Sequence, residues 1–192
     1  LSRIGRYPVR RYIAGGGMSW IFEVVDPELF EARRALKLLK PGEADGETLR
    51  RFRREAELLS RIQHPNLIHI YEFGEDPGTG CSFYTMDYIE GPTLKQHLVR
   101  VRMASISDTI HIAKGLLSAL AYAHSHGVVH RDVKPDNIVL ASNGPMLLDF
   151  GIARAIEAAG DEKLTRSGFT VGTSAYMSPE QVLAVKDLDS RS

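Results

Sequence analysis

Two stretches in the second half of the chain decide how the rest of it is interpreted: Val129-His130-Arg131-Asp132-Val133-Lys134-Pro135-Asp136-Asn137-Ile138-Val139-Leu140 and Leu147-Leu148-Asp149-Phe150-Gly151. They place an acidic residue, a lysine two residues later and an amide five residues later ahead of a second acidic residue. Phosphoryl transfer needs this set, because a carboxylate must face the nucleophile, a cation must neutralise the γ-phosphate and two oxygen ligands must hold Mg²⁺. Chance is a poor explanation for both stretches in this order and between plausible strands.

The chain ahead of these stretches begins with short strands. Strand-like runs are expected near residues 12–13, 20–25 and 34–39, and again at 67–73 and 82–89. Between the third and fourth runs, apolar residues recur at steps of three and four, namely Leu49, Phe52, Ala56 and Leu59. This spacing predicts an amphipathic helix from about residue 47 to residue 62.

Helices are expected after the break at Glu90-Gly91-Pro92. Ser107 is the expected N-cap of a long helix that runs to about His126. The buried stripe of this helix is expected to consist of Ile106, Ile110, Ala113, Leu117 and Leu120. Strands first and helices afterwards predict an α+β chain of two lobes.

Two further features of the strand region fit phosphate chemistry. The cluster Gly15-Gly16-Gly17 lies between two strands, where small residues let backbone N–H groups approach phosphates, although a plain β-turn explains three glycines equally well. No Gly-Lys-Ser/Thr follows, which excludes a Walker A loop, and the strand that follows disfavours a Rossmann fingerprint. Lys37 and Glu55 are expected to form an ion pair, because a carboxylate on the buried face of a helix needs a partner.

On these residues the chain resembles the eukaryotic-type (Hanks-type) Ser/Thr protein kinases, and its motifs are most similar to those of bacterial members. The resemblance extends to Ser178-Pro179-Glu180, which stands where kinases carry Ala-Pro-Glu. It implies a bilobal kinase fold: a β-rich N-lobe with one main helix at about residues 1–86, a hinge at 87–91, and a mainly helical, incomplete C-lobe at 92–192. Lys134, together with Gly172-Thr173 before Tyr176, matches the Ser/Thr class rather than the tyrosine class.

The resemblance implies a role for each matching residue of the two stretches. Asp132 would be the catalytic base, or would orient the substrate hydroxyl, while Lys134 would neutralise the γ-phosphate. Lys37 would hold the α- and β-phosphates. Metal binding, to Mg²⁺ or to Mn²⁺ in its place, is assigned to Asn137 and Asp149.

ATP and regulatory contacts are also implied by the resemblance. The residues assigned to ATP are Ile13, Ala14, Gly15, Gly16, Gly17, Ser19, Ile21, Ala35, Lys37, Glu55, Met86, Asp87, Ile89 and Val139. Arg131 would receive a phosphate carried by Thr165 or Ser167, with Thr170 the less favoured site. Ala14 and Ser19 depart from the glycines of the family pattern, and at most a weaker nucleotide affinity is expected from them.

The function implied is ATP- and Mg²⁺-dependent phosphorylation of Ser or Thr on protein substrates. One alternative is a non-catalytic nucleotide-binding module or scaffold, a pseudokinase. Pseudokinases typically lose the lysine, the base or a metal ligand, whereas this chain keeps all of them. A second alternative is a small-molecule phosphotransferase of the same fold, which usually lacks a lysine at the position of Lys134.

Composition restricts the kinds of binding partner and the cellular compartment that can be expected. Lys plus Arg and Asp plus Glu both number 24, so no net charge draws nucleic acid or an anionic membrane to the chain. The single cysteine, Cys81, excludes a disulfide framework and fits a reducing compartment. A cytoplasmic domain is therefore expected, or the cytoplasmic part of a longer membrane-anchored protein. The expected partners are protein substrates and a second copy of the chain for phosphorylation in trans.

Two expectations remain. His124-x-His126 has no third ligand nearby and is not expected to bind a metal. The sequence stops just after the activation segment, so residues 1–192 are expected to fold poorly alone.

Overall fold

The computed structural model describes residues 2–16, 18–42, 46–150, 174–183, 185 and 188–191. The chain divides into two compact units. The first consists of Leu1–Arg61 and His69–Tyr88, and the second of Ile62–Ile68 and Ile89–Ser192. The boundary after Tyr88 falls within residues 87–91, the stretch that the sequence assigns to the hinge.

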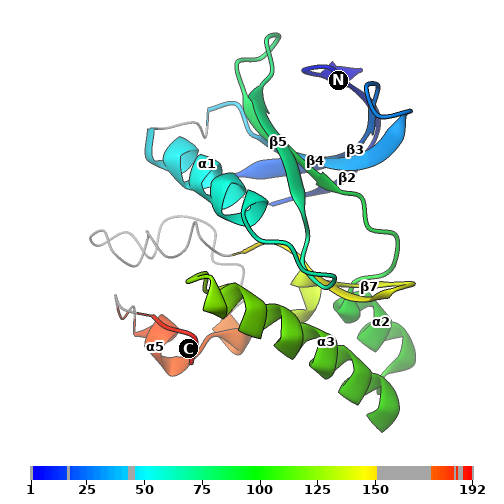
Figure 1. Cartoon of the computed structure of the whole chain (residues 1–192), viewed down its shortest axis with the longest axis vertical. Coiled ribbons are helices and arrows are strands. Elements are labelled where there is room, and N and C mark those ends of the chain that lie inside the picture. Colours follow the sequence, from blue (N-terminus) through cyan, green and yellow to red (C-terminus); the bar gives the residue numbers. More distant parts are fainter. Residues whose placement is uncertain are drawn as a thin grey trace. The chain divides into compact units, whose positions relative to one another are not determined.

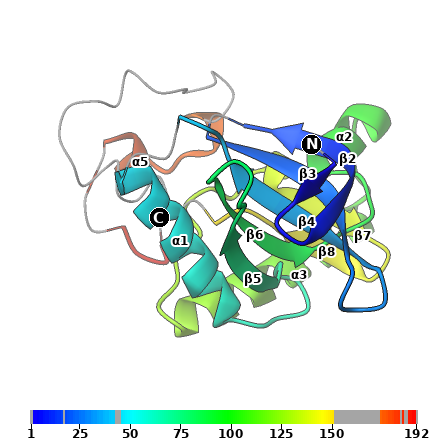
Figure 2. The same ribbon diagram turned by 90° about the horizontal axis from the view of Figure 1, so that it is seen from above.

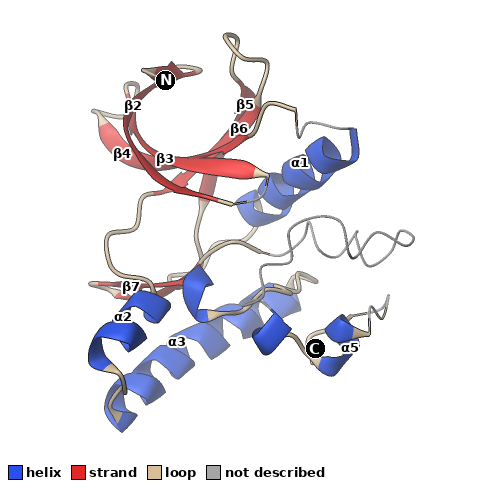
Figure 3. Ribbon diagram, turned by 180° about the vertical axis from the view of Figure 1, so that it is seen from behind, coloured by secondary structure: helices blue, strands red, loops and turns tan. Residues whose placement is uncertain are grey.

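The first unit is an antiparallel sheet with one helix (Figure 1 and, coloured by secondary structure, Figure 3). The strands follow the order β1-β2-β3-β4-β6-β5. Their bounds are Arg3–Ile4 (β1), Tyr7–Gly15 (β2), Ser19–Asp26 (β3), Ala32–Leu39 (β4), Ile70–Glu75 (β5) and Ser82–Asp87 (β6). The strands that the sequence predicts are thus present, although the fourth begins only at Ile70.

One apolar core cluster of this unit lies on a single face of the sheet. Alternation along β4 sends Leu36 and Leu38 to that face and Lys37 to the other. The cluster contains Ile4, Tyr7, Phe22, Val24, Leu36, Leu38, Cys81 and Phe83. Seen from above, the sheet curls, which brings β1 toward the β5–β6 hairpin (Figure 2). The Gly5 N–H donates to Asp76 Oδ1 at 2.7 Å, and this bond holds the turn after β1 close to the turn between β5 and β6.

Helix α1 (Gly46–Ser60) follows the predicted amphipathic pattern. Phe52, Ala56 and Leu59 are buried, as their spacing requires. The Phe52 ring packs against Tyr84 of β6, with a centroid separation of 4.9 Å. This packing fixes which side of the helix faces the sheet, and Glu55 lies on that side.

The second unit combines helices with a small hairpin (Figure 1). Its elements are α2 (Leu94–Val101), α3 (Ile106–Ser125), the 3₁₀ turn η1 (Pro135–Asn137), β7 (Ile138–Ala141), β8 (Gly144–Leu147), the 3₁₀ turn η2 (Ser174–Tyr176) and α5 (Pro179–Val182). Residues 62–68 join this unit although the sequence assigns them to the N-lobe. The reason is a pair of backbone bonds with β8: Ile68 N donates to Leu147 O, and Leu147 N donates to Asn66 O.

Helix α3 differs from its prediction at its start and along its buried face. Its N-cap is Ser105 rather than Ser107, because the Ser105 hydroxyl accepts the Asp108 N–H at 3.0 Å. The predicted stripe is wrong, since Ile106 and Leu117 are 82% and 64% exposed. Small residues at steps of four form the packed face instead, namely Gly115, Ala119 and Ala123. Gly115 meets Pro145 of β8 so closely that a Cβ would lie 2.6 Å from its ring.

In the part of the chain that the structure describes, no helix has both the length and the apolar character needed to cross a bilayer.

Candidate active site

A buried ion pair in the first unit joins β4 to α1. Lys37 Nζ lies 3.0 Å from Glu55 Oε1, and the two side chains are 13% and 6% exposed. The contact expected from the sequence is therefore present. A buried carboxylate needs more than one donor to offset its lost hydration, and the Tyr84 hydroxyl supplies another at 2.8 Å.

Tyr84 is the member of this group that sequence reasoning missed. It stands directly opposite Lys37 in the β4–β6 register, so the two side chains share one face of the sheet. The available signal was its position two residues before Met86, on the same face of an apolar strand. Strand pairing had to be known before that signal could be used.

The turn between β2 and β3 carries the glycine cluster. Gly16 N donates to Ser19 O, and Lys40 Nζ donates to Gly16 O at 2.6 Å. A Cβ on Gly15 would lie 2.4 Å from the Tyr12 hydroxyl, so a larger residue here would require the exposed Tyr12 side chain to move aside. Ala14 has no left-handed backbone angle and fits β2 without strain. Gly17 lies outside the described residues.

Other residues assigned to ATP lie on the sheet face that carries Lys37. Ile21 pairs with Lys37 across β3 and β4, and Ala35 pairs with Met86 across β4 and β6. Directly opposed residues share a face in an antiparallel pair, so these four form one surface. Ile13, near the end of β2, is 38% exposed.

The second unit holds the acidic, basic and amide groups of the first decisive stretch close together. Lys134 Nζ lies 2.8 Å from Asp132 Oδ2, and Asn137 Nδ2 donates to the same oxygen at 2.9 Å. Asn137 Nδ2 also donates to the backbone carbonyl of Asp132 at 2.8 Å. The turn η1, which begins at Pro135, folds the chain back so that a separation of five residues becomes a direct contact.

His130 fixes the loop that precedes this cluster. Its Nδ1 accepts the Asp132 N–H at 3.2 Å, which leaves Nε2 to donate to Leu148 O at 2.8 Å. Its ring stacks against Phe150 with a centroid separation of 4.4 Å. Burial lowers the pKa of His130 from its ordinary value, so the ring is neutral at physiological pH.

Arg131 adopts a left-handed backbone angle, with φ of 64°. Such an angle costs free energy in a residue other than glycine, and the Gln181 amide stabilises it by donating to Arg131 O at 2.6 Å. Burial lowers the pKa of the Arg131 guanidinium. Within the described ranges no carboxylate forms an ion pair with this guanidinium.

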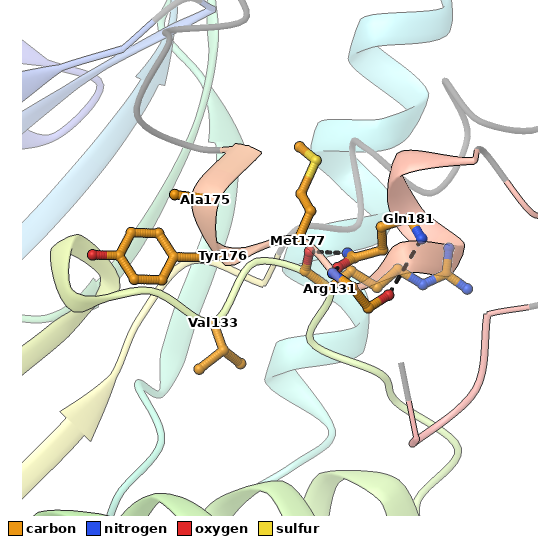
Figure 4. A pocket seen from close by; sticks show the side chains of 7 residues that line it. Arg131, Val133, Ala175, Tyr176, Met177 and Gln181 are labelled. Carbon is orange, nitrogen blue, oxygen red and sulfur yellow. Dashed lines mark hydrogen bonds between the residues drawn. The ribbon is translucent and has the colours of Figure 1, made fainter.

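A pocket of about 300 Å³ lies beside this loop (Figure 4). It is lined by Arg131, Val133, Ala175, Tyr176, Met177, Ser178 and Gln181. Ser178 caps α5 by accepting the Gln181 N–H, and the Gln181 side chain returns a bond to the Ser178 N–H. The bond from the Gln181 amide to Arg131 O connects this capped segment to the loop that carries Asp132.

The residues assigned to the metal fit a magnesium site of the kind completed by phosphate oxygens. The two bonds from the Asn137 side chain to Asp132 both come from Nδ2, so the amide oxygen lies outside these contacts. Asp149, with φ of 44°, lies next to the Phe150 that packs on His130. Elsewhere in the described residues, His, Cys, Asp and Glu form no metal-binding group of three. One amide and one carboxylate suit Mg²⁺, which takes few protein ligands alongside phosphates.

The remaining assigned residues belong to the second unit or lie outside the described ranges. Val139 is buried in β7 and Ile89 is half-buried, both in the second unit. Thr165, Ser167 and Thr170 lie outside the described residues.

Geometry and sequence together define the class of protein. A sequence profile of the protein kinase domain matches residues 7–191, and the chain belongs to this family. The resemblance to bacterial Ser/Thr kinases and the predicted kinase fold are thereby confirmed. As a family, protein kinases use ATP with a divalent metal.

Particular relatives are bacterial. The chain is 36% identical over 190 residues to the serine/threonine-protein kinase PrkC of Bacillus subtilis, a match that covers 96% of this chain and 28% of PrkC. It is 37% identical over 184 residues to the serine/threonine-protein kinase PknA of Mycobacterium tuberculosis, covering 93% of this chain and 42% of PknA. The chain thus spans less than half the length of these relatives.

The same fold occurs in solved structures. The crystal structure of the Mycobacterium tuberculosis PknI kinase domain matches with a TM-score of 0.68 at 34% identity. This match covers 83% of the present chain and 66% of the PknI chain.

Proposed function

We propose that this chain transfers the γ-phosphoryl group of ATP to serine or threonine hydroxyls of proteins, with Mg²⁺ as the metal. The observation that carries the proposal is the cluster of Asp132, Lys134 and Asn137 around one carboxylate oxygen. A cation and an amide, each within 3 Å of the same carboxylate oxygen, provide groups that phosphoryl transfer requires.

Asp132 accepts or orients the proton of the substrate hydroxyl in this proposal. Lys134 and Asn137 both contact Oδ2 of this carboxylate, which restricts its rotation and orients it toward the substrate hydroxyl. During transfer the Lys134 ammonium neutralises charge on the phosphoryl oxygens. Mg²⁺, held by the Asn137 oxygen and Asp149, would supply charge neutralisation between the phosphates.

Lys37 holds the α- and β-phosphates. Glu55 and Tyr84 restrict its ammonium to one position, so the entropy of ordering a long side chain is paid during folding rather than at binding. The apolar surface formed by Ile21, Ala35 and Met86 beside Lys37 suits a planar adenine.

The hinge backbone binds the edge of the adenine ring. The Asp87 N–H donates to His69 O at 3.1 Å, so we assign the contact with the base to the Asp87 carbonyl instead. Ile89 contributes its own backbone, and Ile13, Val139 and the β2–β3 turn complete the contacts.

Protein acceptors are favoured over small molecules by Lys134 and by the pocket beside Arg131. A pocket lined by Val133, Tyr176 and Met177 offers apolar area to a side chain next to the acceptor hydroxyl. A metabolite would leave this surface unused.

Phosphorylation in trans regulates the chain in our proposal, at Thr165 or Ser167 and less favourably at Thr170. The support is Arg131, a half-buried cation that no described carboxylate neutralises. A phosphate brings roughly −1.5 to −2 charges and strong acceptors that pair with arginine. Phosphorylation of one copy by another requires transient self-association. The single cysteine fits a cytoplasmic location for this segment.

The test is transfer of labelled phosphate from ATP to protein acceptors by the full-length protein with Mg²⁺. We expect labelled serine or threonine, and loss of labelling in Asp132→Asn. ATP binding without transfer to any acceptor would favour a scaffold, and transfer to metabolites alone would favour a small-molecule phosphotransferase. Mass spectrometry of the same samples locates the autophosphorylated residues. Full activity with all three candidate hydroxyl residues changed to alanine would remove the regulatory part of the proposal.

A further inference from the structure

Two consecutive residues at the end of β6, Asp87 and Tyr88, are held by side-chain clusters on opposite faces of the sheet. The clusters begin from two consecutive arginines of β4, Arg33 and Arg34, whose side chains must point to opposite faces. We call them the Tyr88 cluster (Arg11, Glu23, Arg33 and Tyr88) and the Asp87 cluster (Arg34, His69, Tyr71 and Asp87).

Glu23 organises the Tyr88 cluster. Its carboxylate, 4% exposed, accepts from Arg11 Nε at 2.7 Å and from Arg33 Nε at 2.9 Å. The Arg33 guanidinium then lies over the Tyr88 ring, 4.1 Å from its centroid, and Arg11 Nη2 donates to the Tyr88 hydroxyl at 2.7 Å. Burial acts to raise the pKa of Glu23, but bonds from Arg33 and Arg11 outweigh it and the pKa lies below its ordinary value. Both arginines that hold Tyr88 are therefore themselves held by an ionised Glu23.

The Asp87 cluster anchors the preceding residue. The Asp87 carboxylate accepts from the Tyr71 hydroxyl at 2.6 Å and from His69 N at 3.1 Å. The Arg34 guanidinium stacks on the Tyr71 ring, 3.7 Å from its centroid. Arg34 also stands opposite Asp87 in the β4–β6 register, so strand pairing and side chains act together here.

Tyr88 depends more strongly on its cluster than Asp87 does. Strand β6 ends at Asp87, so no ladder of backbone bonds continues through Tyr88. Arg33 and Glu23 share the sheet face of Ala35 and Lys37, the face that we assign to ATP. The Tyr88 cluster, which we call the anchor, therefore acts on the chain immediately beyond Asp87, where the proposed adenine contacts begin.

We propose that Glu23, Arg33 and Tyr88 are positioning residues that order the adenine-binding backbone before the nucleotide arrives. The inference rests on the proposed function for its ligand, although the anchor itself is a property of the first unit alone. If the backbone of one residue becomes ordered only when ATP binds, the entropy cost of ordering it lowers the affinity for ATP by roughly 5- to 30-fold. Loss of the anchor should therefore weaken ATP binding and leave the chemical step alone.

The experiment compares Glu23→Gln and Tyr88→Leu with a matched control, Glu57→Gln. Glu57 pairs with Arg61 on the exposed side of α1, so its variant also breaks one carboxylate–arginine pair in the same unit. Three quantities are measured in the full-length protein: hydrogen exchange of the amides at 86–89, the Kd of a fluorescent ATP analogue, and KM for ATP separately from kcat. Tyr88→Phe, which removes only the hydroxyl, serves if the larger change prevents folding.

We expect about tenfold faster exchange at 86–89 in Glu23→Gln and Tyr88→Leu, a rise in Kd and KM of similar size, and kcat within about twofold of wild type. Glu57→Gln should resemble wild type in all three. Unchanged exchange at 86–89 overturns the anchor, and faster exchange with unchanged Kd overturns its role in nucleotide binding. If the wild-type protein bound no ATP analogue, the proposed function would fail, whereas the exchange data would still decide whether the anchor exists.

Discussion

Removing the Tyr84 hydroxyl is the sharpest test of the buried ion pair between Lys37 and Glu55. Tyr84→Phe keeps the ring that packs on Phe52 and deletes only the donor to Glu55 Oε1, which lies 2.8 Å away. The Glu55 carboxylate remains buried and keeps Lys37 at 3.0 Å. The substitution therefore isolates one hydrogen bond to a buried charge.

The expected cost follows from that geometry. A hydrogen bond to a charged group contributes about 1.5–3 kcal/mol, and the 6% exposure of Glu55 leaves little solvent to replace it. For a chain of this length, each kcal/mol lowers Tm by about 2–4 °C, so we expect a fall of about 3–12 °C. KM for ATP should rise several-fold, because Lys37 loses part of the support that holds it in place.

Thermal unfolding and steady-state kinetics of the full-length protein measure both effects. Tyr12→Phe is the control, since that tyrosine lies in the same sheet and is 55% exposed. A double-mutant cycle with Glu55→Gln separates the hydrogen bond from general damage, with an expected coupling of about 1–3 kcal/mol. Additive losses, with coupling below about 0.5 kcal/mol, would refute the argument that Tyr84 acts through Glu55.

Three other variants test separate parts of the molecule. Asp132→Asn should lower phosphoryl transfer by roughly 10²- to 10⁴-fold with little change in Tm, measured by labelled ATP; turnover equal to wild type would contradict its role. His130 has a lowered pKa, so the unfolded chain binds more protons than the folded chain at low pH. Stability should therefore fall below about pH 6.5 with a slope of up to about 1.4 kcal/mol per pH unit, and His130→Gln, which cannot titrate, should flatten this slope in urea unfolding. Gly91→Ala should destabilise by about 1–3 kcal/mol or more, because φ is +149° and the new Cβ would lie 2.2 Å from Leu140 O. Gly127→Ala shares the strain of a positive φ, +72°, but its Cβ meets no neighbouring group within 4 Å, so it should cost less in thermal unfolding.

Sequence periodicity predicted the first unit well because its elements are strongly patterned. Helix α1 shows the clearest case, since Phe52, Ala56 and Leu59 are buried as their spacing requires. The same reasoning failed for α3, where Ile106 and Leu117 are exposed and the alanines are buried. Periodicity identifies large apolar residues, whereas the close approach of Pro145 in β8 leaves room only for a small residue at Gly115. A pattern of alanine and glycine carries almost no hydrophobic signal.

The site divides in the same way between what local sequence could predict and what it could not. Asp132 and Asn137 are five residues apart, and a single 3₁₀ turn brings them together, so their motif nearly specifies their geometry. The ion pair between Lys37 and Glu55 could be predicted because periodicity identified the buried face of the helix that carries Glu55. Tyr84 depended on the pairing of β4 with β6, a contact between strands more than forty residues apart that no local pattern encodes.

This division implies that the two halves of the proposed machinery respond differently to destabilisation. The Asp132 cluster is closed by bonds within one short loop, together with His130 and its bond to Leu148 O. The ion pair of Lys37 depends on the packing of α1 on the sheet, since Glu55 reaches it from that helix. Core substitutions that loosen α1 should therefore weaken ATP binding before they disturb the Asp132 cluster. Sequence changes far from any motif in the first unit should thus alter nucleotide affinity while leaving the proposed transfer cluster at Asp132 intact.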